Sequence, residues 1–122
     1  MIRPEQFEQT WGTVKLADFI RGEVLRLSYT AWDLAPFARD LGYQGPPFPW
    51  DEEDRRHRMA RLDAVFFRLY GLDRQDADYV LERFPIVREH DEREFGRYRT
   101  KDLILGYLNA VAAGDFTSQV KA

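Results

Sequence analysis

The sequence predicts a mainly α-helical protein, a compact bundle of five to six helices with one ordered loop rich in proline, glycine and aromatic residues. Three observations predict this fold class. Apolar residues recur at intervals of three and four along most of the chain, as on the buried face of a helix. Acidic or hydroxyl residues precede these stretches and glycines follow them, as at helix ends. Apolar residues make up 44% of the 122 residues, enough for the core of one domain.

The expected organisation has three parts: an N-terminal extension over 1–15, one helical domain over 16–114, and a flexible tail over 115–122. The extension contains polar residues with a few apolar anchors and is expected to form a short helix after Pro4. The expected helices of the domain span about 16–28, 33–41, 51–70, 74–84, 86–95 and 101–113. For the end of the first helix, a strand over 24–30 is the alternative.

Short polar side chains mark the expected helix starts. Asp33, Asp51, Asp73 and Thr100 each precede an apolar-periodic stretch and are expected as N-caps. The helix over 51–70 has the strongest pattern, because four acidic residues crowd its first turn, where the helix dipole favours negative charge. Its expected buried stripe consists of Met59, Leu62, Val65, Phe66 and Leu69. In the following helix, Phe84 is expected to point inward.

The segment over 42–50 cannot form a regular helix or a central strand, because it contains two glycines and three prolines. Its rings Tyr43, Phe48 and Trp50 need a surface to pack on, so an ordered loop is expected. Two interpretations remain open for these rings. They close one edge of the core, or they form an exposed interface for a protein partner.

Composition and charge exclude several classes of protein. The formal net charge of −3 argues against a domain that grips phosphate backbones over its whole surface. The absence of cysteine removes disulfides, thiol nucleophiles and cysteine-based zinc sites. No apolar run approaches the roughly 20 residues that cross a bilayer, so a cytoplasmic location without membrane contact is expected.

No catalytic, cofactor-binding or metal-binding residues are predicted. His57 and His90 stand alone in the sequence, without the paired ligands that a metal needs, and are expected at the surface. The carboxylates over 51–54 and at Asp91, Glu92 and Glu94 are expected to face water. Neither serine lies in a nucleophile elbow, and no phosphate-binding glycine motif occurs. The chain alone is therefore not expected to be an enzyme.

One basic cluster is a candidate for contact with DNA. Arg97, Tyr98, Arg99 and Lys101 surround an expected turn and helix N-terminus, where basic side chains and free N–H groups can bind a phosphate. The alternative interpretation is that these cations pair with the many carboxylates of the same chain.

Two stretches resemble a known family. The first contains Leu62-Asp63-Ala64, Leu69-Tyr70-Gly71-Leu72, Phe84-Pro85 and Gly96-Arg97-Tyr98-Arg99-Thr100-Lys101 in that order, followed by an apolar helix. The second covers 27–38 and is followed by Gly42-Tyr43 and Gly45-Pro46-Pro47-Phe48. Together, over about 24–112, they resemble the C-terminal region of large bacterial N6-adenine DNA methyltransferases. This group includes fused type IIG restriction–modification enzymes and related phage-defence methylases.

The resemblance implies an accessory part without chemistry of its own. In the family, methyl transfer needs a glycine-rich S-adenosylmethionine loop and an Asn-Pro-Pro-Tyr type motif, and both lie upstream of the region resembled. Here Gly45 stands before Pro46-Pro47-Phe48 where the motif requires asparagine, so no catalytic role carries over. The implied partners are a methyltransferase or restriction subunit or domain, with DNA as a further candidate. A protein-binding module without DNA contact is the alternative.

Overall fold

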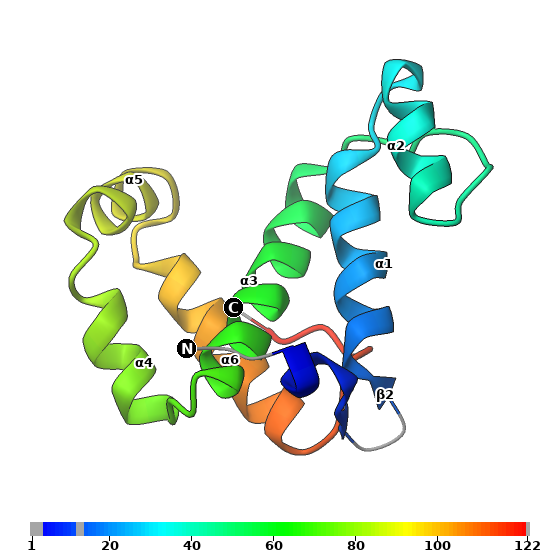
Figure 1. Ribbon diagram of the computed structural model, residues 1–122. Coiled ribbons are helices and arrows are strands. Elements are labelled where there is room, and N and C mark those ends of the chain that lie inside the picture. The colour runs from blue at the N-terminus through cyan, green and yellow to red at the C-terminus, as the bar shows by residue number, and fades with distance from the viewer. Residues whose placement is uncertain (1–3, 12–13, 122) are drawn as a thin grey trace.

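The computed structural model describes residues 4–11 and 14–121, and its described residues form six α-helices (Figure 1). The long helices are α1 (Leu16–Ser28), α3 (Glu52–Leu69) and α6 (Arg99–Ala112). The shorter ones are α2 (Ala35–Asp40), α4 (Arg74–Leu81) and α5 (Pro85–Phe95). The mainly helical prediction is thus confirmed, and residues 16–28 form a helix throughout, not the alternative strand.

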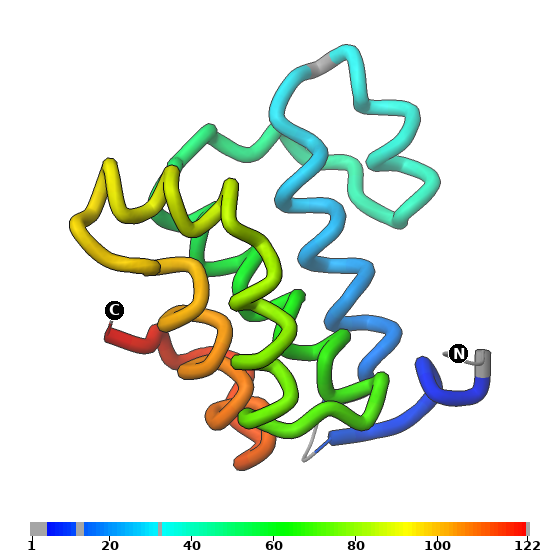
Figure 2. The backbone as a smooth tube through the Cα atoms, turned by 90° about the vertical axis from the view of Figure 1, so that its left-hand side faces the viewer, coloured from blue at the N-terminus to red at the C-terminus, as the bar shows by residue number. Residues whose placement is uncertain are grey.

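Helices α3 and α6 pack against each other as the central pair of the fold. Helix α1 lies on one side of this pair, and α4 and α5 lie on the other, an arrangement that both views show (Figures 1 and 2). Ala60 and Ala64 of α3 face α6 and are almost fully buried, so the two backbones can approach closely. Opposite them lie Leu103, Ile104 and Tyr107 of α6.

Three helix starts show how local side chains set the boundaries. Asp51 caps α3, because its carboxylate accepts a hydrogen bond from the backbone N–H of Asp54. Asp73 caps α4 in a reciprocal capping box with Asp76. The predicted cap at Thr100 is wrong, since Thr100 lies inside α6 and its own N–H donates to the Asp91 carboxylate at 2.5 Å.

Helix α2 differs from its prediction. Asp33 does not cap it, because residues Trp32–Leu34 form a 3-10 turn and the residue before the helix is Leu34. The helix is also too short to bury a continuous face, so only Ala38 is covered, while Leu34 and Phe37 are exposed. It lies at the end of α1, away from the α3–α6 pair (Figure 1).

Both chain ends pack on a second part of the core. The expected short helix after Pro4 is instead a 3-10 turn, Pro4–Glu8, followed by a minimal antiparallel pair of strands, β1 (Thr10–Trp11) and β2 (Val14–Lys15). Phe7 and Trp11 pack there on a buried cluster that includes Phe116, which comes from the tail that the sequence sets apart as flexible. Phe116 is only 6% exposed, because it fills the space between α1 and the end of α6.

No helix within the described ranges is both long and apolar enough to cross a membrane.

Candidate functional site

The predicted basic cluster is neutralised by carboxylates of the same chain. Arg97 pairs with Asp102 at 3.0 Å, and Lys101 pairs with Asp78 at 2.8 Å and Glu82 at 2.6 Å. Arg99 pairs with Glu53 of α3, and this contact lowers the pKa of the Glu53 carboxyl. Tyr98 does not reach the surface, because it is 8% exposed and donates its hydroxyl hydrogen to the Leu81 carbonyl.

The helix N-terminus beside this cluster already holds an anion. Asp91 of α5 is 4% exposed, against its predicted position in water, and its carboxylate accepts from the Thr100 N–H of α6. This carboxylate therefore occupies the place at the α6 start that a phosphate would take. The structure brings the four predicted residues together, but the three cations pair with carboxylates of the same chain and the Tyr98 hydroxyl is buried.

The rings of the 42–50 loop divide between the two interpretations. Tyr43 stacks on Phe48 with ring centroids 5.0 Å apart, and both contact the buried Tyr29 at the end of α1. These two rings close an edge of the fold. Trp50 remains 60% exposed, where it stacks on Arg55 at 3.8 Å and donates to Glu52.

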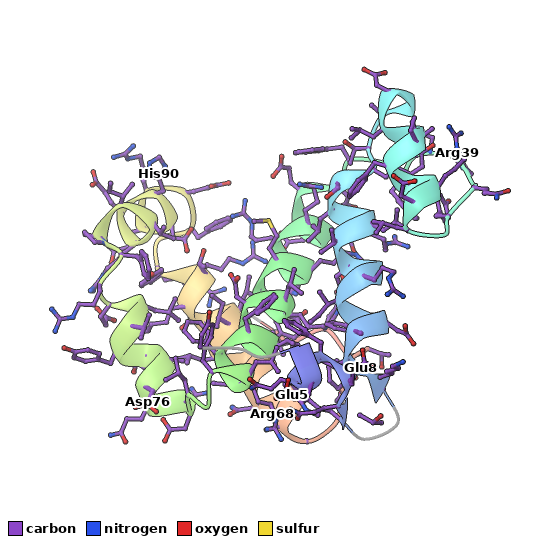
Figure 3. The ribbon with its side chains drawn as sticks, viewed as in Figure 1. Glu5, Glu8, Arg39, Arg68, Asp76 and His90 are labelled. Carbon is purple, nitrogen blue, oxygen red and sulfur yellow. The ribbon has the colours of Figure 1, made fainter. Side chains whose placement is uncertain are left out.

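His57 belongs to a buried polar network, so its predicted surface position is wrong. The ring is 6% exposed, Nδ1 is hydrogen-bonded to the Tyr107 hydroxyl at 2.5 Å, and Nε2 lies 3.3 Å from the Glu53 carboxylate. Tyr107 has no exposed surface, and burial raises the pKa of its hydroxyl. His90, by contrast, lies at the outer edge of α5, as predicted (Figure 3).

This network joins a histidine, a tyrosine and a carboxylate, and its buried members lie apart from the two surface hollows beside α3. Neither His57 nor Tyr107 lines either of the two surface hollows beside α3. Among the residues that the structure describes, no group of three or more His, Cys, Asp or Glu side chains could hold a metal ion. The network is best understood as a polar tie between α3 and α6.

Two neighbouring hollows lie beside α3, on the side that faces α5. The first, of about 300 Å³, lies toward the start of α3 and includes Trp50, Arg55 and Met59. The second, of about 330 Å³, lies toward its end and includes Phe66, Tyr70 and Val87. Asp63 of α3 and Thr100 of α6 line both hollows, so the two are parts of one groove, called here the α3 groove.

Comparison with protein-family models, with curated proteins and with solved structures finds no match for this chain.

The α3 groove collects apolar side chains that the core does not cover. Among the described residues, nine large apolar side chains are exposed, and five of them line this groove. The five are Trp50, Met59, Tyr70, Phe84 and Val87. The predictions that Met59 and Phe84 point inward are therefore wrong. Helix α3 buries its alanines instead, because α6 packs on the side that carries Ala60 and Ala64.

Sequence reasoning missed the groove, although one signal was visible. Residues 52, 56, 59, 63, 66 and 70 recur every three or four positions along α3 and the residue after it, and they form a stripe beside its buried face. Three of these six residues are apolar, and the sequence prediction assigns two of them, Met59 and Phe66, to the core. A helix with two partly apolar faces indicates one contact within the fold and another surface left open to a partner.

Proposed function

We propose that this chain is a non-catalytic accessory domain that binds a protein partner through the α3 groove. The observation that carries the proposal is the concentration of exposed apolar side chains along that groove. Clustered apolar surface of this kind is typical of interaction sites, whereas scattered single side chains are not. Following the sequence resemblance, the partner is the body of an N6-adenine DNA methyltransferase in a restriction–modification or phage-defence system.

The arrangement of charge supports protein binding over DNA binding. A DNA-binding face presents cations that can exchange solvent and counterions for phosphate. Here Arg97, Arg99 and Lys101 are paired with carboxylates, and phosphate contact would require each pair to separate. The proposed role is thus to brace a larger protein, and not to hold the nucleic acid directly.

Val87→Asp is expected to weaken binding to the proposed partner, an N6-adenine DNA methyltransferase polypeptide, by about tenfold or more, because it places a charge in an apolar contact. Isothermal titration calorimetry of the purified proteins measures the effect. Leu34→Asp, just before α2, is the matched control, since Val87 and Leu34 are both 40% exposed and only Val87 lines the groove. The proposal fails if the unmodified chain forms no complex, or if both variants bind equally well.

A double substitution tests the DNA alternative directly. Arg97→Ala combined with Arg99→Ala is expected to leave the affinity for duplex DNA, and its dependence on salt, unchanged. Two true phosphate contacts would reduce the slope of log affinity against log salt concentration by about 2. Fluorescence anisotropy across a salt series distinguishes these results, and a reduced slope would restore DNA contact as a role for this cluster.

A further inference from the structure

We propose that the occupant of the α3 groove is an amphipathic partner helix that places a lysine or arginine against Asp63. This inference rests on the proposed function, since it names the chemistry of the protein partner. Three observations support it. They are the spacing of the residues that line the groove, the change from a charged to an apolar lining along it, and the Asp63 carboxylate, which has no ion pair or hydrogen bond among the described residues.

The spacing favours a helix as the occupant. Eight residues of α3 line the groove. Among the lining residues, a stripe runs along it through Glu52, Arg56, Met59, Asp63, Phe66 and Tyr70, the residue that follows the helix. These positions alternate in steps of four and three, which is the pattern by which one helix presents a seam to another. At 1.5 Å per residue the stripe is about 27 Å long, so it matches a partner helix of about five turns.

The groove is charged at one end and apolar at the other. The end near the start of α3 carries charge, with Glu52, Arg55 and Arg56. The opposite end is apolar, and α4, α5 and α6 supply Leu81, Val87 and Ile104 as its far wall and floor. In Figure 1 the arm formed by α4 and α5 stands apart from α3 on this side of the fold. A partner helix with apolar residues at one end and charged residues at the other therefore has one preferred orientation.

Asp63 lies where these two ends meet, and its carboxylate has no partner. Among the described residues no hydrogen bond or ion pair reaches it, unlike the other carboxylates near the groove, Glu53 and Glu82. Asp63 is exposed at the surface, and partial desolvation by its neighbours raises the pKa of its carboxyl. A partner that covered the groove would remove more water, and an unpaired buried carboxylate is costly. A complementary partner must therefore supply a cation at this position.

A second copy of the chain is a less suitable occupant. The exposed cations of the arm are already engaged, since Arg88 pairs with Glu82 and Glu92, and Arg83 contacts the Tyr79 hydroxyl. A self-complex that places this arm in the groove of a second copy would have to break such a contact to satisfy Asp63. Self-association is accordingly an outcome that the experiment must detect, and sedimentation of the free chain does so.

The test uses a display library, so that it does not depend on the natural partner. The library contains 18-residue helical peptides with apolar residues at seam positions and randomised residues elsewhere, and it is selected on the unmodified full chain. We expect the selected peptides to carry lysine or arginine at one central position. Asp63→Asn should weaken their binding about tenfold, while Asp40→Asn on the distant α2 should leave it unchanged.

A double-mutant cycle on one selected peptide completes the test. Replacing its central lysine by norleucine should weaken binding about tenfold to the unmodified chain and less than about twofold to Asp63→Asn. Several results would overturn the inference: no binding peptides, no preference for a central cation, equal effects in both backgrounds, or a free chain that dimerises through this groove. Failure of the chain to bind a methyltransferase polypeptide would instead count against the proposed function, and the library result would stand separately.

Discussion

Leu103→Ala is expected to lower the free energy of unfolding by about 2–5 kcal/mol, the largest loss among the substitutions considered for this fold. Leu103 has no exposed surface and lies in the core cluster where α6 meets Ala60 and Ala64 of α3. The small alanines cannot extend into the space that a lost leucine side chain leaves. The void therefore remains open, and its cost adds to the lost burial of apolar surface.

Urea unfolding followed by circular dichroism measures this loss. The matched control is Val87→Ala, which removes methyl groups from an exposed position on α5 and should change the free energy of unfolding by less than about 0.5 kcal/mol. The slope of the free energy of unfolding against urea concentration should be the same for the unmodified chain and Leu103→Ala. Equal slopes would show that the difference reflects stability and not a change in the unfolded state. A loss below about 1 kcal/mol for Leu103→Ala would contradict the central position of the α3–α6 contact.

The helices could be predicted from sequence because their signals are local. Asp51 and Asp73 bond to backbone groups three residues away, and Gly96 ends α5 with a positive φ of 76°. Such interactions are independent of the rest of the fold, so they can be read along the chain. The start of α6 could not be read in this way, because its anion is Asp91, which α5 brings back from another element.

The candidate site could be predicted only in part, because sequence periodicity does not say which apolar face meets the core. Of the predicted stripe of α3, Val65 and Leu69 are buried and Phe66 packs partly against the core, whereas Met59 is exposed. The structure also buries the alanines of α3, since close approach to α6 needs small residues. The sequence shows that cations cluster around 97–101. Their partners Glu53 and Asp78 come from other helices, so no pattern near 97–101 in the sequence indicates these ion pairs.

Tyr107→Phe is expected to lower the free energy of unfolding by about 1–3 kcal/mol, although it removes one oxygen atom. The substitution leaves Nδ1 of His57 buried without the hydroxyl that contacts it at 2.5 Å. A buried polar group that loses its partner retains the cost of its own desolvation. Tyr70→Phe is the matched control, because its ring is 61% exposed and its hydroxyl can be replaced by water.

The difference between the unmodified chain and Tyr107→Phe should shrink as the pH rises above about 10. Burial raises the pKa of Tyr107 in the folded state above the ordinary value of 10.0, so folding favours the protonated hydroxyl. The stability that the Tyr107 hydroxyl contributes is fully present at pH values below its pKa in the unfolded chain. It is lost as the pH rises through its pKa in the folded protein. Phenylalanine cannot ionise. Burial also raises the pKa of Tyr98, but this residue is present in both proteins, so its contribution cancels in the difference. Urea unfolding at pH 8 and at pH 11 tests this, and a difference that stayed constant or grew would mean that Tyr107 is not buried as the α3–α6 tie requires.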